Sequence, residues 1–252
     1  MISERLFRKV RLGFSVLLLA AVAGLMTPAR LLAQSPGGNG PPSGPGSPAG
    51  APSAPAATPN QPLNVNPVTG LSSVSALNWR PLTGRERWKL YWKMNYASAG
   101  AYVGPVFTSL VLDQASNSPS AWGGGFEGYG KRLGSRLATA ILQGTFQAAL
   151  AVPLHEDVRY ISSGQTGFKR RIRHAVAFSF LTYNSQGHTT VNIANLTSYY
   201  AATAVSTTWI PIGESKARYT LVNGSEQILL SIPINIVQEF WPEIVHKILR
   251  RP

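Results

Sequence analysis

A low-complexity segment rich in proline, glycine and serine runs from Ser35 to about Pro67. It has almost no apolar mass and no charge, so burial of side chains cannot offset the entropy cost of ordering it. We therefore expect a disordered tether that is partly extended at its prolines and loosened at its glycines. The sequence accordingly predicts a linker at residues 34–76 and a folded domain at residues 77–252.

Residues 1–33 have the three parts of a secretory signal peptide: a basic start, an apolar run from Leu12 to Met26, and the small residue Ala33 before Gln34. The apolar run is shorter than the roughly 20 residues of a spanning helix, which favours cleavage over an uncleaved membrane anchor. No twin-arginine pair is present, so we expect the general secretory route. The prediction is export to the periplasm or the cell envelope.

The chain contains no cysteine. This excludes a disulfide framework, a cysteine-based zinc site, a thiol nucleophile and a bacterial lipoprotein anchor. The formal net charge of +13 favours anionic partners, such as lipid headgroups or lipopolysaccharide. We expect no nucleic-acid partner, because an exported chain without a recognisable reading motif is a poor candidate for one.

Helical spacing of apolar residues dominates the remainder. Thr83 and Glu86 have the spacing of a capping box that starts a helix, and Pro105 is expected to kink or interrupt that helix. Residues 193–209 read as a helix, with a strand as the alternative because of their threonines and valines. A last long helix is expected from about Glu214 to Phe240, with a bend at Pro233.

A short basic helix is then expected to start at Pro242. These patterns together predict an all-α fold, a bundle of about five to six helices.

A stripe of small residues, Gly130, Gly134 and Ala138, repeats every four positions ahead of the uncharged stretch Leu137–Leu154. Small residues at this interval let two helices approach closely, so the stripe is a candidate surface for a helix-packing partner.

The densest set of ionisable residues is the polar cluster His155, Glu156, Asp157 and Arg159. Consecutive residues on a helix point in different directions, and the motif lacks the paired histidines of zinc proteases. A structural role at a turn is therefore favoured over catalysis, and we expect neither a metal nor a cofactor. Nucleophilic catalysis has no support either, because no serine-hydrolase motif is present.

The strongest cationic cluster is Lys169, Arg170, Arg171 and Arg173. Positive charge at a helix N-terminus opposes the helix macrodipole, so the cluster suggests a purpose beyond a solvated helix start. We predict that it binds an anionic envelope surface.

Three motifs give the chain a resemblance to a family of exported soil-bacterial proteins. They are the GYGKRLGS helix entry, the HxDxRY turn and the closing QEF helix, and the likeness runs over roughly residues 79–251. The matching positions are Gly128, Gly130, Lys131, Arg132, Gly134, Ser135, His155, Asp157, Arg159, Tyr160, Gln238, Glu239 and Phe240. The resemblance implies export and assigns no activity.

The leading functional hypothesis is a non-enzymatic envelope protein whose helical domain associates with a membrane in a peripheral or shallow mode. Glutamines and prolines within the apolar stretches argue against a conventional multipass protein. One alternative is an envelope enzyme, such as a hydrolase, built around His155, Asp157 and Arg159. Another is a soluble periplasmic scaffold or binding bundle.

Overall fold

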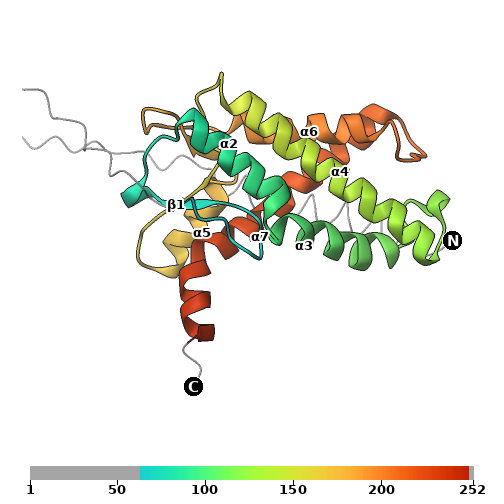
Figure 1. The fold of residues 1–252 in the computed structure, drawn as a ribbon, viewed down its shortest axis with the longest axis horizontal. Coiled ribbons are helices and arrows are strands. Elements are labelled where there is room, and N and C mark those ends of the chain that lie inside the picture. The colour runs from blue at the N-terminus through green and yellow to red at the C-terminus, as the bar shows by residue number, and fades with distance from the viewer. Residues whose placement is uncertain (1–62, 250–252) are drawn as a thin grey trace, which may run out of the picture.

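The structure, a computed structural model, describes residues 63–249. The expected signal peptide and most of the expected linker lie outside these residues. The chain is mostly helical, which confirms the predicted fold class (Figure 1). The helices are α2 (Gly84–Trp92), α3 (Gly100–Phe107), α4 (Gly125–Ala151), α5 (Phe168–Ala177), α6 (Ile193–Ser206) and α7 (Lys216–Leu249). Two π-helical segments, η2 (Lys93–Ala97) and η3 (Thr108–Gln114), follow α2 and α3.

The residues at 193–206 form α6, so the strand alternative for this segment was wrong. Asn192 caps α6, because its side chain accepts a hydrogen bond from the backbone N–H of Asn195 at 3.2 Å. The capping box that starts α2 is confirmed, with Thr83 and Glu86 each accepting a hydrogen bond from the other's backbone N–H.

Two short strand pairs lie beside the helices, and the sequence analysis did not expect them. Strands β1 (Ser73–Ser75) and β2 (Tyr160–Ser162) are parallel, with Ser73 opposite Tyr160. Strands β3 (Leu181–Tyr183) and β4 (Thr189–Val191) form an antiparallel hairpin, with Leu181 opposite Val191. Each strand has three residues, which is too short for an alternating pattern to be recognised.

The boundary expected between linker and domain was wrong. Residues 63–76 pack on the domain, where Asn66 and Ser72 are buried. The side-chain amide of Asn66 donates to Oε1 of Gln238 at 2.9 Å, although the two residues are 172 positions apart in the sequence. The folded part therefore begins before Leu77, and the polar composition of this segment conceals its burial because its partners are also polar.

The prolines do not end helices where the sequence analysis expected. Pro105 lies inside α3, and the chain breaks earlier, at Ser98, whose backbone is extended. Helix α7 includes both Pro233 and Pro242, so the separate terminal helix expected at Pro242 was wrong. Figure 1 shows that α7 changes direction toward its C-terminal end.

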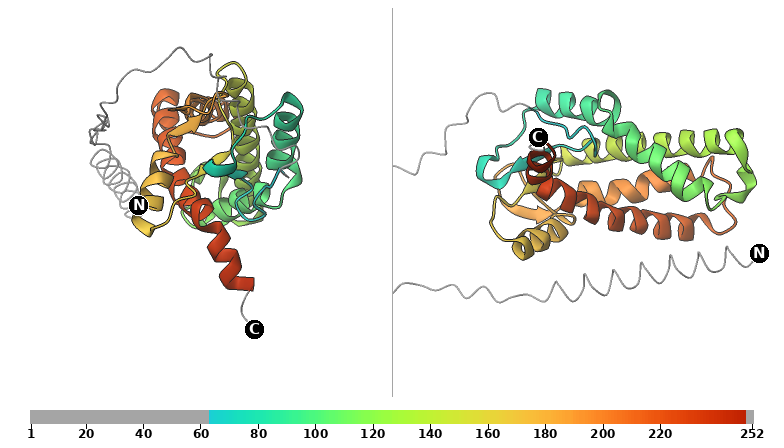
Figure 2. Two further views of the ribbon diagram at one scale, coloured as in Figure 1. Left: turned by 90° about the vertical axis from the view of Figure 1, so that its left-hand side faces the viewer. Right: turned by 90° about the horizontal axis from the view of Figure 1, so that it is seen from below.

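The four longest packed segments form an elongated bundle. Helix α4 packs against α6 and against α3 with η3, and α6 packs against α7 (Figure 2). One end of the bundle carries α5 and the four strands, and we call it the sheet end. The opposite end carries residues 115–124 and 207–215, and we call it the loop end. Residues 207–215 contact α4 there, because Trp209 Nε1 donates to Ser135 Oγ at 2.9 Å.

Candidate functional site

Glu156, from the predicted polar cluster, caps the start of α6. Its side chain is 3% exposed, and its two oxygens accept hydrogen bonds from the backbone N–H groups of Ile193 at 3.1 Å and Ala194 at 2.9 Å. A carboxylate suits this position because the first N–H groups of a helix lack intrahelical partners and carry partial positive charge. The Glu156 carboxylate therefore joins the end of α4 to the start of α6.

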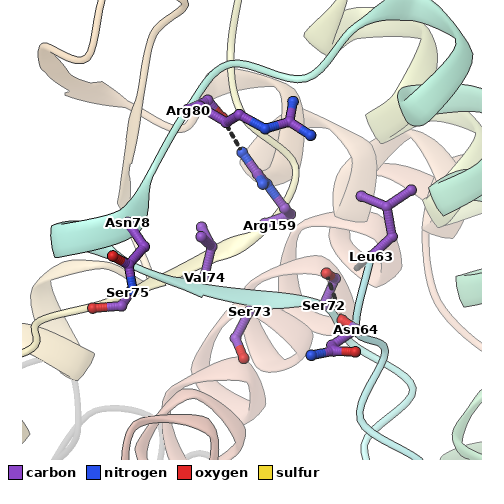
Figure 3. A pocket seen from close by; sticks show the side chains of 9 residues that line it. All are labelled: Leu63, Asn64, Ser72, Ser73, Val74, Ser75, Asn78, Arg80 and Arg159. Atoms are coloured by element: carbon purple, nitrogen blue, oxygen red, sulfur yellow. Dashed lines mark hydrogen bonds between the residues drawn. The ribbon is translucent and has the colours of Figure 1, made fainter. Parts of the chain in front are cut away.

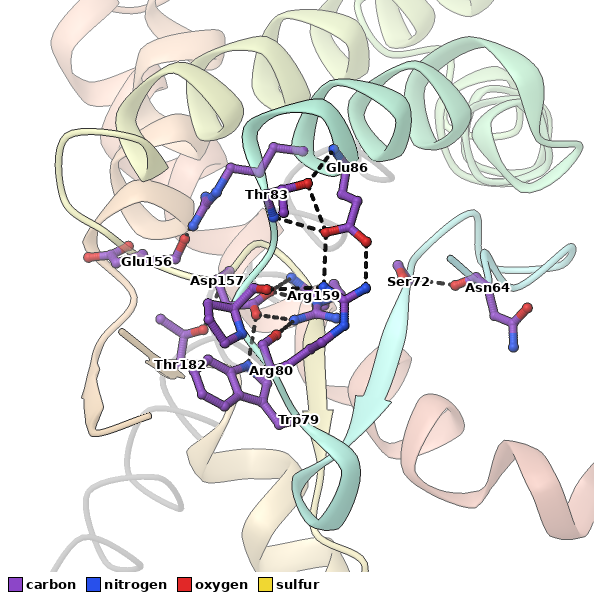
Figure 4. Close-up of polar contacts among 12 residues, drawn as sticks. Asn64, Ser72, Trp79, Arg80, Thr83, Glu86, Glu156, Asp157, Arg159 and Thr182 are labelled. Atoms are coloured by element: carbon purple, nitrogen blue, oxygen red, sulfur yellow. Dashed lines mark hydrogen bonds and ion pairs between the residues drawn. The ribbon is translucent and has the colours of Figure 1, made fainter. Parts of the chain in front are cut away.

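Asp157 uses both carboxylate oxygens within the protein (Figure 4). Oδ2 accepts from Trp79 Nε1 at 2.8 Å and from the Arg159 guanidinium at 2.5 Å. Oδ1 accepts from the backbone N–H of Arg159 at 2.9 Å and from Arg159 Nε at 3.0 Å. No oxygen of Asp157 is left to act as a base, so this residue holds the turn together.

Arg159 extends the network to the segment ahead of α2. Its guanidinium donates to the backbone carbonyl of Arg80 at 2.6 Å, and Arg80 pairs with Glu86 through both carboxylate oxygens (Figure 4). Hydrogen bonding by Arg80, assisted by the backbone and side chain of Thr83, lowers the pKa of Glu86 to about 2. The capping box of α2 is thus linked through Arg80 to the buried Asp157–Arg159 pair.

His155 lies apart from these groups. Its side chain is exposed, and its φ of 55° places it in the left-handed region, which histidine tolerates better than most residues. The four residues of the predicted cluster therefore do not converge on one site: Glu156, Asp157 and Arg159 are buried in structural contacts, and His155 faces outward.

The carboxylates of residues 63–249 are all engaged. Glu156 caps α6, and Glu226 interacts electrostatically with Arg136. The remaining acids form ion pairs, which are Glu86–Arg80, Asp113–Arg136, Glu127–Lys131, Asp157–Arg159, Glu214–Arg218, Glu239–Arg171 and Glu243–Arg171. Within the described part of the chain, no group of three His, Asp or Glu side chains could hold a metal ion. The same residues contain no unpaired carboxylate dyad for general acid and base work.

The predicted cationic cluster divides into two sets. Lys169, Arg170 and Arg173 are exposed on α5. Arg171 instead turns toward α7, where it pairs with Glu239 and Glu243 and lies 4.1 Å from the ring centroid of Phe240. The assignment of Arg171 to an anionic-surface site was therefore wrong, because its charge is already compensated within the protein.

Glu239 is a further buried acid, 2% exposed, and it anchors α7 to the strand β2. It accepts hydrogen bonds from the Tyr160 hydroxyl at 2.7 Å and from the backbone N–H and hydroxyl of Ser163. Burial, followed by the hydrogen bond to Glu239, raises the pKa of Tyr160. The QEF motif thus acts in the fold, since Gln238 also bonds Asn66.

Arg132 is a structural residue that composition and spacing did not single out. It is 0% exposed, and no carboxylate pairs with it among residues 63–249. Its guanidinium donates to side-chain or backbone oxygens of Gln114, Asn117, Ser118, Pro119 and Gly123. The motif around it follows from this contact, because a Cβ on Gly128 would collide with the Gly123 carbonyl and the Arg132 guanidinium.

Two of the three residues in the predicted stripe of small residues make no close helix contact within residues 63–249. Gly130 and Gly134 are exposed, and a Cβ on either would meet no atom within 4 Å. Close helix approach in α4 occurs instead at Gly144, against which the Asn95 side chain packs. The helix-packing partner proposed for Gly130, Gly134 and Ala138 stays a prediction.

The described surface contains a cavity and a groove near these residues. A cavity of about 250 Å³ lies beside β1, lined by serines and by Arg80 and Arg159, whose charges are paired with Glu86 and Asp157 (Figure 3). A groove of about 310 Å³ lies between α3 and α7, with Gln143 on α4 and Asn195 on α6 among its lining residues. The groove is also lined by Arg87, which forms no ion pair among residues 63–249 and whose guanidinium donates to the backbone carbonyl of Glu156 at 2.9 Å.

Fold and site together define a helical bundle domain whose buried ionisable groups hold its parts in place. Comparisons of the chain with protein-family models, with curated proteins and with solved structures found no match. The resemblance to a family of exported soil-bacterial proteins therefore stays a prediction, carried by the motifs alone.

Proposed function

We propose that the protein is a non-enzymatic component of the cell envelope whose helical domain binds a membrane or another anionic envelope surface. One observation carries the proposal: α5 presents Lys169, Arg170 and Arg173 to solvent, next to Phe168, which is 67% exposed. Cations beside an exposed aromatic ring are typical of helices that lie at a membrane interface. The carboxylates of the described residues are engaged in structural contacts, which supports a role other than catalysis.

The electrostatics of α5 support the same proposal. Three basic residues near a helix start oppose the macrodipole, and none of the ion pairs found among residues 63–249 includes them. A basic residue close to an anionic membrane surface contributes about 1 kcal/mol of attraction. Together the three cations would contribute roughly 3 kcal/mol, which is about a 100-fold change in affinity.

The test is sedimentation of the mature chain with vesicles that contain phosphatidylglycerol, at low salt. The triple variant K169Q/R170Q/R173Q should bind about 100-fold more weakly. The control K131Q/K216Q/R218Q removes the same number of exposed cations at the loop end, and it should lose much less because Lys131 and Arg218 are already paired with Glu127 and Glu214. Equal losses in the two variants would assign binding to net charge alone, and failure of the unaltered chain to bind vesicles would overturn the proposal.

The soluble periplasmic binding bundle is a second candidate, and the groove of about 310 Å³ between α3 and α7 favours it. This volume lies at the small end of the range for ligand pockets. The candidate requires the protein to stay in solution without detergent, which the same sedimentation experiment reports. For the hydrolase alternative, the geometry of His155, Asp157 and Arg159 supplies no supporting observation.

A further inference from the structure

Apart from Ile228 and Ile232 of α7, the buried residues of the bundle helices are small or polar, and many large apolar residues lie outside. The buried residues of α6 are Ala194, Ser198, Ala202, Thr203 and Ser206. The exposed apolar residues on α3, η3 and α7 are Tyr102, Val103, Val106, Phe107, Leu110, Val111, Leu112, Leu221, Val222, Leu230, Ile234 and Val237. A helix of a water-soluble bundle buries its apolar stripe, so this distribution is the reverse of the soluble pattern.

Hydrogen bonds between helices satisfy the polar interior. Gln143 Nε2 on α4 donates to Ser198 Oγ on α6 at 3.0 Å. Gln227 Nε2 on α7 donates to Thr203 Oγ1 on α6 at 3.0 Å, and the Tyr200 hydroxyl lies 2.9 Å from Ser225 Oγ. Helix contacts through small residues and interhelical hydrogen bonds are typical of bundles in membranes, where apolar burial gives no driving force.

Charged residues lie on both sides of one layer of the bundle, and in α7 this layer lies between Glu226, which interacts electrostatically with Arg136, and Glu239. Leu137–Leu154 in and after α4 and Met94–Leu112 through α3 contain no Asp, Glu, Lys or Arg. The Arg136–Asp113 ion pair limits both stretches on the side of the loop end. The helical part of the first stretch, Leu137–Ala151, spans roughly 22 Å, about three quarters of the roughly 30 Å of a hydrocarbon core.

Exposed tryptophans lie beside this uncharged layer and at its limit near the loop end. Trp88 and Trp92 on α2 are exposed, and the neighbouring Tyr91 bonds Thr145 of α4. Trp209, 38% exposed, is hydrogen-bonded to Ser135 beside the Arg136–Asp113 pair. Tryptophan is enriched at the two interfaces of a membrane.

Helix α7 adds a separate indication. By length and composition alone, Lys216–Lys247 could cross a membrane, since its most apolar 18 residues have a mean hydropathy of 1.2. A core helix of a soluble protein passes the same test when it is mostly buried, but only 33% of the most apolar part of α7 is buried. Most of this apolar part of α7 therefore lies on the outer surface of the bundle.

We infer that the bundle of α3, α4, α6 and α7 is inserted in a lipid bilayer. Its uncharged layer lies in the hydrocarbon, and the sheet end and the loop end lie in the headgroup regions. The inference rests on the proposed function and changes its depth, from a peripheral contact to an embedded domain. Lys169, Arg170 and Arg173 on α5 then lie at the headgroup level of the sheet end, where anionic lipid neutralises them.

Single cysteines can test the depth, because the natural chain has none. We would introduce Val106→Cys and Leu230→Cys in the uncharged layer, with Lys131→Cys and Ser185→Cys as matched exposed controls at the loop end and the sheet end. Each variant of the mature chain is nitroxide-labelled and reconstituted in vesicles of phosphatidylcholine and phosphatidylglycerol. The readout is the accessibility of the label to oxygen and to a water-soluble paramagnetic chelate.

Insertion predicts that labels at 106 and 230 lose chelate accessibility and gain oxygen accessibility, while labels at 131 and 185 stay accessible to the chelate. If the chain binds vesicles but all four labels remain accessible to the chelate, insertion is overturned and the proposed function stands. If the chain does not bind vesicles, both fail. The same labels are also measured without vesicles. If the labels at 106 and 230 are then already inaccessible to the chelate because the chain forms an oligomer, the apolar surface contacts a second copy of the chain and insertion is overturned.

Discussion

Asp157 and His155 lie two positions apart and have opposite surroundings. Asp157→Asn leaves the buried Arg159 guanidinium without its compensating charge, so we predict a loss of about 3 kcal/mol in the free energy of unfolding. His155→Asn keeps a residue that accepts a positive φ and should change the free energy by less than about 0.5 kcal/mol. Chemical denaturation in detergent micelles, followed by circular dichroism, measures both. Equal effects of the two changes would contradict the structural role assigned to Asp157.

Glu86 gives the stability of the domain a predictable acid dependence. Its pKa is lowered from 4.5 to about 2, so its carboxylate stabilises the folded state above pH 4.5 and loses that contribution as the pH falls toward about 2. Glu86→Gln removes the contribution at neutral pH. The gap in unfolding free energy between the natural chain and this variant should therefore shrink across that window. A gap that stays constant from neutral pH to pH 2 would show that the Arg80–Glu86 pair contributes nothing.

At the scale of the helix, α4 contains two glycines with different surroundings. Gly128→Ala places a methyl group against the Gly123 carbonyl and the buried Arg132 guanidinium, so we predict a loss of roughly 2 kcal/mol or more in stability. Gly130→Ala adds its methyl group in open space within a helix and should stabilise the domain by up to about 1 kcal/mol. The midpoints of thermal unfolding should therefore move in opposite directions. Destabilisation by Gly130→Ala would instead reveal a contact on the exposed stripe.

The sequence predicts elements well where the signal is local. The capping box at Thr83 was predicted from its own spacing, and the helices α4 and α6 were predicted from the helical spacing of residues within each element. The short strands β1 and β2 were missed because they pair across the chain and are too brief to show a period. The helix was expected to pass Pro233 with a bend, but its continuation through Pro242 was missed because a proline is common at the start of a new helix.

The candidate site was predicted only in part, because its partners are distant in sequence. Sequence reasoning favoured a structural role for the polar turn, and the contacts of Glu156 and Asp157 support that role. It could not separate Arg171 from Lys169, Arg170 and Arg173, since Glu239 and Glu243 lie on another helix. The sequence of this basic run does not indicate which of its side chains faces another helix and which faces solvent.

At the scale of the whole domain, residues 63–249 distribute polarity in the reverse of the pattern of a water-soluble bundle. The polar side chains between α4, α6 and α7 bond each other, and the apolar side chains of α3 and α7 face outward. The sequence concealed this because glutamines and prolines within apolar stretches usually argue against insertion. Once Gln143 and Gln227 are bonded inside the bundle, they no longer oppose contact with lipid.

The most direct measurement is extraction of the protein from membranes of the cell that makes it. We predict that washes with high salt and with alkaline carbonate leave it in the membrane pellet and that only detergent releases it, because apolar contact with lipid does not depend on ionic strength. Release by high salt alone would contradict insertion and restore the peripheral mode. Recovery of the protein in the soluble fraction at low salt would contradict membrane association altogether.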